Sequence, residues 1–175
     1  MSENIIVGTV ATPAGIYHAA CTETGLGRLA FPTDDPNECL AWARRWAPQA
    51  QIHSSGSLLD DLAQQLTAYF EGRLRVFELP LDLRGTPFQM QVWREVLGVG
   101  YGEVRTYAEI AAAIGKPQAF RAVGAANGAN PIPIIVPCHR LIGANGSLIK
   151  YGGGLAVKRQ LLALEGVTLH EVSKL

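Results

Sequence analysis

The pattern of apolar residues changes near residue 85, and this change limits the folds available to the chain. Before it, residues 5–9, 15–21 and 28–31 are short runs of alternating or β-branched residues, separated by Thr12-Pro13 and by glycine-containing turns. Such runs predict an antiparallel meander. After it, helix signals dominate. With 48% hydrophobic and 17% charged residues, the chain can bury a core in each part. We therefore expect two domains, residues 1–83 and 84–175.

The first part also contains segments with apolar residues at helical spacing. Residues 36–46 and 58–70 are predicted helices, and Gly72 is well placed to end the second. Residues 48–56 are predicted to form a loop, and residues 76–81 one more strand.

The second part begins with two helix-start signatures. Thr86-Pro87-Phe88-Gln89 is a capping box with proline at the first helical position, and its helix should run to about Leu97. Thr106-Tyr107-Ala108-Glu109 is another capping box, whose helix should end near Gly115. Residues 118–127 and 155–164 are further predicted helices. The second and third helices have helix-turn-helix spacing, although plain packing gives the same pattern.

The predicted helix over residues 118–127 is poor in side chains that read base edges in the major groove. Its small residues would let a backbone approach a partner closely, and Arg121 carries its only charge. A small-residue face that packs on a neighbouring helix is the alternative.

A proline-rich apolar run leads to the best nucleophile candidate. Residues 131–136 are predicted to be extended and buried, and they lead to Pro137-Cys138-His139-Arg140. Adjacent cations favour the thiolate, which is the reactive form of cysteine. A buried, inert cysteine is the alternative. Because neighbours in a strand point to opposite faces, Cys138 and His139 can share a site only if the chain turns there. Arg140 is interpreted as structural.

Charge and cysteine content narrow the possible partners and locations. The net charge of the chain is zero, yet residues 1–85 carry a net charge of −4 and residues 86–175 carry +4. An anionic partner would therefore bind the second part. Chance scatter of surface charge is the alternative.

Three cysteines and the absence of a secretory signal pattern favour a reducing, cytoplasmic location without membrane association. No metal site is expected, because the spacings of the candidate ligands match no common zinc pattern. These candidates are His18, Cys21, Cys39 and His53.

Several of these residues together resemble a known family. The chain resembles the O6-alkylguanine-DNA alkyltransferases in three stretches. The first runs from Arg121 to Ile142 and contains Pro-Cys-His-Arg after Asn130-Pro-Ile-Pro. The other two are Tyr151-Gly-Gly-Gly-Leu and Leu161-Leu-Ala-Leu-Glu-Gly. The similarity covers roughly residues 84–166. It implies a two-domain α/β protein. The N-terminal domain would be a ribonuclease-H-like sheet with helices, and the mostly helical C-terminal domain would hold a helix-turn-helix and the active-site cysteine.

The resemblance also implies a chemistry. Cys138 would accept the alkyl group of O6-alkylguanine, and of O4-alkylthymine, in double-stranded DNA. His139 would take the thiol proton through a water molecule, Glu165 would orient His139, and Tyr107 would donate a proton to the leaving guanine. No group restores the thiol, so each chain would act once, without a cofactor. The damaged nucleotide would be flipped out through the minor groove.

The family pattern assigns further residues to DNA and to the substrate pocket. Arg121 would fill the gap left by the flipped nucleotide. The small-residue face that approaches DNA would comprise Ala122, Gly124, Ala125, Ala126 and Asn127. The pocket would be lined by Asn130, Pro133, Ile149, Lys150, Tyr151 and Gly152. Ile149 and Lys150 depart from the family, which has a small residue followed by glycine or asparagine. Because β-branched Ile149 tolerates positive φ poorly and adds bulk, we predict altered acceptance of bulky adducts.

Three other functions remain open from the sequence. A non-reactive alkyltransferase-like binder would carry another residue in place of Cys138. A helix-turn-helix regulator would present polar base readers on its second helix and dimerise. A thiol hydrolase would turn over many times. For the alkyltransferase we expect a monomer that binds DNA weakly and in a salt-sensitive way, with cooperative binding along DNA left open.

Overall fold

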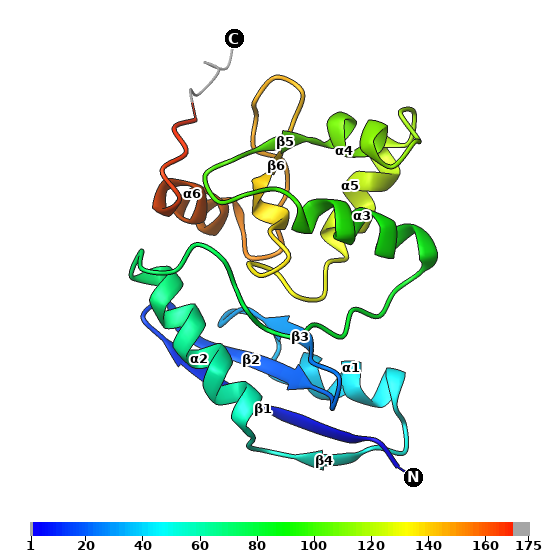
Figure 1. Cartoon of the computed structure of the whole chain (residues 1–175), viewed down its shortest axis with the longest axis vertical. Helices are drawn as coiled ribbons and strands as arrows, with labels where there is room; N and C mark the ends of the chain where they lie inside the picture. Colours follow the sequence, from blue (N-terminus) through cyan, green and yellow to red (C-terminus); the bar gives the residue numbers. More distant parts are fainter. Residues whose placement is uncertain (1, 170–175) are drawn as a thin grey trace. The chain divides into compact units, whose positions relative to one another are not determined.

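A computed structural model describes residues 2–169 of the chain. The chain divides into two compact units, Met1–Arg84 and Gly85–Leu175, and each is described by itself. Figure 1 shows the sheet-containing first unit in blue to green and the helical second unit in green to red. Among residues 2–169, no helix is both long enough and apolar enough to cross a lipid bilayer.

The first unit is built on a four-stranded sheet of order β3-β2-β1-β4. Strands β1 (Asn4–Thr12), β2 (Gly15–Cys21) and β3 (Leu26–Ala30) form the predicted antiparallel meander. Strand β4 (Gln51–His53) pairs parallel to β1. The prediction of a loop over residues 48–56 is therefore wrong for these three residues. A three-residue strand at a sheet edge has too few positions to show alternation, which is why no pattern revealed it.

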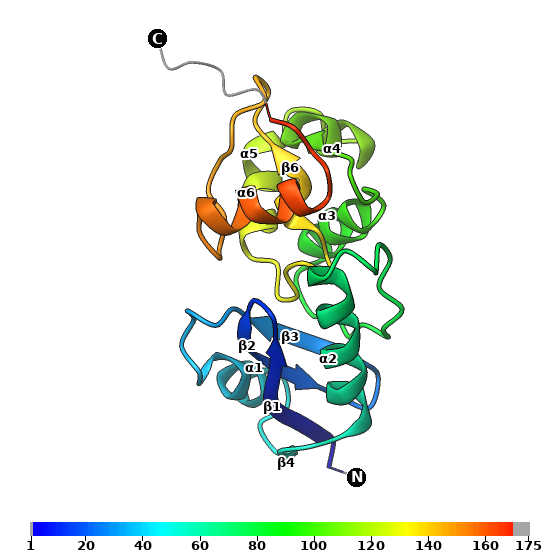
Figure 2. The same cartoon turned by 90° about the vertical axis from the view of Figure 1, so that its left-hand side faces the viewer.

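Two helices cover opposite faces of this sheet (Figure 2). Helix α1 (Glu38–Trp46) packs Cys39, Trp42 and Ala43 on a core that includes Ile5 of β1. Helix α2 (Ser57–Phe70) lies on the other face, where a Cβ atom built on Gly8 would come within 2.5 Å of Cδ1 of Leu59. Ile5 and Gly8 differ in parity along β1 and therefore face opposite sides.

The strand predicted over residues 76–81 is wrong. Only Leu81 pairs with the sheet, through a bridge to Leu26, while the Leu26 amide donates to the carbonyl of Pro80 at 2.9 Å. Proline has no amide hydrogen and cannot continue a ladder.

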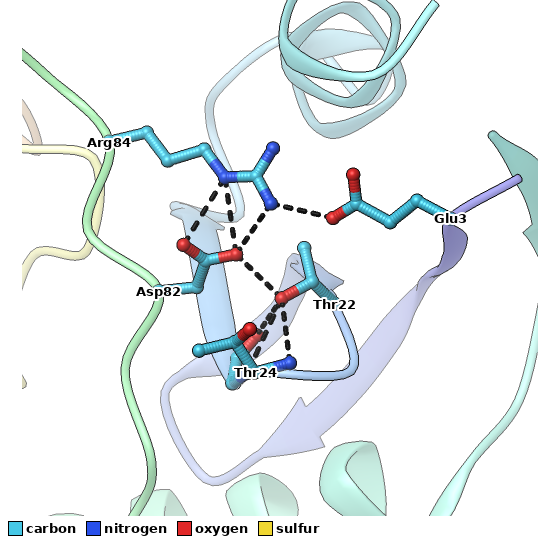
Figure 3. Close-up of polar contacts among 6 residues, drawn as sticks. Glu3, Thr22, Thr24, Asp82 and Arg84 are labelled. Atoms are coloured by element: carbon cyan, nitrogen blue, oxygen red, sulfur yellow. Dashed lines mark hydrogen bonds and ion pairs between the residues drawn. The ribbon is translucent and has the colours of Figure 1, made fainter. Parts of the chain in front are cut away.

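A polar network then fixes the end of the first unit (Figure 3). The Thr22 hydroxyl donates to Asp82 at 2.6 Å, and the Arg84 guanidinium donates to Asp82 at 2.7 Å and to Glu3 at 2.6 Å.

The second unit is mainly helical, as predicted. Helices α3 (Pro87–Leu97) and α4 (Tyr107–Ala113) begin at the two expected capping boxes, and both reciprocal bonds of each box are present. Helix α5 (Phe120–Gly128) follows α4 after a short turn, and the two lie side by side (Figure 1). Helix α6 (Leu155–Leu164) has the predicted bounds. A short parallel pair joins β5 (Arg105–Thr106) to β6 (Leu141–Ile142).

The segment before Cys138 is buried, as predicted, but it is not extended. Ile134 has a φ of 73°, and the Val136 amide donates to the carbonyl of Ile132 at 2.9 Å, so residues 131–136 form a compact turn. The Asn130 side chain closes this turn from inside. Its amide nitrogen donates to Val136 O at 2.8 Å, and its oxygen accepts from the Ile132 amide at 3.0 Å.

Candidate active site

The nucleophile candidate lies in a tight turn between two buried segments. Residues Cys138–Arg140 form the 3-10 helix η1, which the Arg140 amide closes on the carbonyl of Pro137 at 2.9 Å. This supplies the turn that Cys138 and His139 need in order to share a site. Cys138 is only 5% exposed and His139 is fully buried.

One carboxylate joins the two residues that follow Cys138. Nε2 of His139 lies 2.8 Å from Oε1 of Glu165, the residue after the last turn of α6. Arg140 donates to the same carboxylate from Nε at 2.9 Å and from a terminal nitrogen at 2.8 Å. Its other terminal nitrogen donates to Val99 O at 2.6 Å. Arg140 therefore has a structural role: it fixes the position of the Glu165 carboxylate, which in turn fixes the orientation of the His139 ring.

This arrangement determines which nitrogen of His139 can accept a proton. A carboxylate only accepts hydrogen bonds, so Nε2 carries the hydrogen that Glu165 accepts. The other ring nitrogen, Nδ1, is buried and has no hydrogen-bond partner among residues 2–169. In the neutral ring Nδ1 is therefore the basic atom.

Burial keeps both Cys138 and His139 neutral at rest. It raises the pKa of the Cys138 thiol above its ordinary value, although Asn130 and Lys158 act in the opposite direction. It lowers the pKa of His139, against the raising effect of Glu165. Nearby cations favour the thiolate, as the sequence indicates, but desolvation outweighs their attraction in the resting site. A neutral thiol and a neutral imidazole occupy the site.

Lys158 is a site residue that sequence reasoning missed. It is fully buried in α6, and Nζ donates to Leu141 O at 2.5 Å and to Ile149 O at 3.3 Å. Burial lowers the pKa of Lys158 to about 8. The signal was present in the sequence. Lys158 and Glu165 are three or four residues from Leu161 and Leu162, so all four lie on the buried stripe of one helix.

Other predicted residues gather around the cysteine. The Asn127 amide nitrogen donates to Cys138 O at 3.3 Å, which the sequence did not suggest. Tyr107 lies near Asn127 and Cys138, and burial raises the pKa of its hydroxyl. The ring of Tyr151 lies 6.5 Å from that of His139. Pro133 is buried in the preceding turn, while Gly152 is exposed.

The predicted DNA-facing residues of α5 divide into two groups. Arg121, Ala122 and Ala125 are exposed and Gly124 is half-buried, as a contact face requires. Ala126 and Asn127 point into the unit, so placing these two on the DNA-facing surface was wrong. The reason is helical geometry: both belong to the inward stripe, where Trp93 donates to Ala126 O at 2.8 Å.

The two residues that depart from the family pattern lie on the surface of the loop before Tyr151. Ile149 is 45% exposed and Lys150 is also exposed. Within residues 2–169, Ile134 is the only residue other than glycine with positive φ, so the backbone-strain argument for Ile149 is wrong. Its side chain instead packs toward Gly143, where an added Cβ atom would lie 3.1 Å from Cδ1 of Ile149.

Comparison with known proteins identifies the family. The model of the 6-O-methylguanine DNA methyltransferase ribonuclease-like domain matches residues 5–83, and that of the DNA binding domain of the same protein matches residues 87–167. A methylated-DNA–protein-cysteine methyltransferase of Mycobacterium bovis is 62% identical over 120 residues, which are 69% of each chain. The chain belongs to the methylated-DNA–protein-cysteine methyltransferase family.

Two further matches extend over most of this methyltransferase. The Methanosarcina barkeri methylated-DNA–protein-cysteine methyltransferase is 44% identical over 156 residues, which are 89% of this chain and 94% of the relative. The crystal structure of Mycobacterium tuberculosis OGT in complex with DNA has a TM-score of 0.79 at 43% identity, covering 91% of this chain and 92% of that one. The predicted family and two-domain fold class are confirmed.

Proposed function

We propose that this methyltransferase repairs double-stranded DNA by moving an alkyl group from O6 of guanine, and from O4 of thymine, to Sγ of its own Cys138. The observation that carries the proposal is the arrangement of three side chains. Cys138 is buried beside a neutral His139, and the hydrogen-bearing nitrogen of that ring faces Glu165 at 2.8 Å. Its other nitrogen, Nδ1, stays available as a base.

The proposed step moves one proton from the thiol and one alkyl group to the sulfur. Nδ1 of His139 takes the thiol proton through a water molecule, and Glu165 stabilises the resulting imidazolium. Sγ attacks the alkyl carbon as the bond from that carbon to O6 breaks. The Tyr107 hydroxyl gives a proton to N3 of the leaving guanine, which departs neutral. Arg140 keeps the Glu165 carboxylate in place throughout.

The resting neutrality of the pair suits this sequence of events. An isolated buried thiolate is costly, because water no longer solvates it. In this site negative charge on sulfur arises only when an electrophilic carbon is present to accept the electron pair. A thioether is stable to hydrolysis, and the mechanism provides no step that removes it. Each chain would therefore act once and would need no cofactor.

Intact-mass spectrometry after incubation with a duplex carrying one O6-methylguanine tests the proposal. We expect a gain of one methylene per chain, mapped to Cys138 and absent from Cys138→Ser. Binding without a mass gain would favour the non-reactive binder, and continued product formation beyond one per chain would favour the hydrolase. Either result would refute single-use repair.

DNA recognition follows from the exposed face of α5. We propose that Arg121 fills the space left by an extruded nucleotide while Ala122, Gly124 and Ala125 allow a close approach of the helix to the minor groove. Apart from Arg121, this face has no side chain suited to major-groove readout, which argues against the regulator. Phosphate contacts should dominate, so affinity should fall steeply between low and moderate salt, and a salt-independent affinity would contradict this. We expect a monomer in solution.

The loop before Tyr151 should influence which adducts react. Ile149 adds bulk and Lys150 adds charge at the surface of this loop. Comparing O6-benzylguanine reaction rates of the wild type and Ile149→Thr/Lys150→Gly tests this influence of the loop, and equal rates would refute it.

The three free thiols suit a reducing compartment, and we propose a cytoplasmic location for the protein.

A further inference from the structure

An aromatic side chain at the start of α5 has no explanation in the core of the second unit. Phe120 is the first residue of α5, and it is 44% exposed. The residue before it, Ala119, makes no side-chain capping bond, so Phe120 is not part of a capping motif at the start of the helix. Phe120 lies directly beside Arg121 and Ala122, which belong to the exposed face of α5 that the proposed function assigns to DNA.

Phe120 is paired with the cation that the proposed function places in DNA. The guanidinium carbon of Arg121 lies 5.9 Å from the centre of the Phe120 ring, within the range of a cation–π contact. A second pair of the same kind involves the turn between α4 and α5, where Nζ of Lys116 lies 5.1 Å from the centre of the Phe88 ring. Lys116, Phe120 and Arg121 are all exposed.

We propose that Phe120 contacts DNA and acts with Arg121 as one stacking unit at the gap left by the extruded nucleotide. This inference rests on the proposed function and adds a residue to its DNA interface. A guanidinium held over a ring keeps fewer conformations in solution, so it loses less freedom when it enters the duplex. The ring itself offers an apolar face to sugars and unstacked bases, as apolar side chains do in other minor-groove complexes.

The structure favours this role over two simpler ones. A packing role would bury Phe120, yet the residue is 44% exposed. A role limited to orienting Arg121 would leave the ring's exposed surface without a partner when DNA binds. Stacking on DNA accounts for both the exposure of the ring and the position of the guanidinium.

The test compares transfer from a duplex with transfer from a free base. Single-turnover rates are measured for a duplex with one O6-methylguanine and for free O6-benzylguanine, which needs no nucleotide extrusion. We expect Phe120→Ala to slow duplex transfer about tenfold, the loss of one stacking contact, and to change the free-base rate less than about twofold. Phe120→Leu should fall between wild type and Phe120→Ala, since it keeps apolar bulk without an aromatic face.

Two further variants sharpen the test. If Phe120 and Arg121 act as a unit, Phe120→Ala/Arg121→Ala should be no more than about twofold slower on the duplex than Arg121→Ala alone. Leu97→Ala is the matched control, because Leu97 is an exposed apolar residue, 39% exposed, at the end of α3. It should change neither rate.

Each other outcome has a distinct meaning. Normal duplex transfer by Phe120→Ala, with slow transfer by Arg121→Ala, would overturn the role of Phe120 while the proposed function stands. Equal slowing on the duplex and on the free base would show a structural role and would also overturn it. A wild type that alkylates Cys138 from neither substrate would refute the proposed function, and this inference with it.

Discussion

Replacing Lys158 by methionine tests the electrostatics of the candidate site. The pKa of Lys158 is about 8 in the folded chain, against an ordinary 10.5, so burying its ammonium costs about 3 kcal/mol at pH 7. Methionine removes that cost but leaves Leu141 O and Ile149 O without their donor, at about 1–3 kcal/mol each. The two effects nearly cancel. At pH 7 we expect the free energy of unfolding to change by no more than about 3 kcal/mol.

The dependence on pH separates the two effects. Between pH 8 and 10.5 the folded wild type has released the Lys158 proton while the unfolded chain still holds it. The unfolded state then binds more protons, so the stability contributed by this group rises with pH, by about 1.4 kcal/mol per pH unit. Relative to Lys158→Met, the wild type should gain about 3 kcal/mol over this range. The lost hydrogen bonds add a difference that does not vary in this way.

Two buried thiols of the first unit, Cys21 and Cys39, do not disturb the comparison. Burial raises the pKa of Cys21 and of Cys39 to about 12, so these thiols lower stability as pH rises above their ordinary pKa, which is near 9. They are present in both proteins and cancel in the difference.

Urea unfolding at pH 7, 8, 9 and 10, followed by ¹⁹F NMR of 5-fluorotryptophan, provides the assay. Trp93 lies in α3 and reports on the second unit, whereas the other two tryptophans, Trp42 and Trp46, belong to α1. Lys150→Met, at an exposed position, is the control and should differ from wild type by the same amount at every pH. A constant difference for Lys158→Met as well would show that the buried amine keeps its proton, and the reasoning would be refuted.

Three further predictions concern the turn, the base and the carboxylate that faces the base. Asn130→Ala removes both bonds that close residues 131–136 and should lower the free energy of unfolding by about 2–5 kcal/mol in urea titration. Asn130→Asp should lose at least as much, because a buried carboxylate oxygen would then face Val136 O in place of the amide donor. A loss below that of an ordinary surface substitution would contradict this. Because the pKa of His139 is lowered, the single-turnover transfer rate should stay level as pH falls through 6.5 and decline only below it. A decline centred on or above 6.5 would show that His139 is not the base. Glu165→Gln should slow transfer at every pH, since the imidazolium loses its anion.

Helix boundaries could be predicted from the sequence because their causes are local. The Thr86 hydroxyl accepts from the Gln89 amide at 3.2 Å, and the Gln89 side chain accepts from the Thr86 amide at 2.9 Å, all within four residues. The same logic holds at Thr106. Where both partners of a bond lie within one turn of helix, their spacing in the sequence is sufficient evidence.

Elements that depend on distant partners could not be predicted in this way. Strand β4 exists because Gln51–His53 meets the start of β1, and residues 76–81 fail to form a strand because Pro80 offers only a carbonyl to Leu26. Ile134 adopts positive φ because Asn130 closes the turn around it. None of these partners is visible in a local pattern of apolar residues.

The site was predicted in part. Cys138 could be singled out from its own neighbours, whereas Glu165 came from the family resemblance and meets His139 only in the folded chain, 26 residues away in sequence. The resting ionisation of the thiol could not be settled from the sequence, because the sequence shows nearby cations but not the loss of water around the sulfur. The polar residues on the buried stripe of α6 were the available signal for Lys158.

Burial of the thiol also bears on the proposed single use. If each chain reacts once, any reaction of Cys138 with an unrelated electrophile or oxidant consumes a whole protein molecule. Such reactions proceed through the thiolate and need access to the sulfur. A thiol that is 5% exposed, with its pKa raised by burial, restricts both access and ionisation. Arg140 and Lys158 are already fixed on their partners before substrate arrives, so the site needs little rearrangement when the proton leaves sulfur. The site therefore combines a resting thiol of low reactivity with charged groups that are already in position for the transfer.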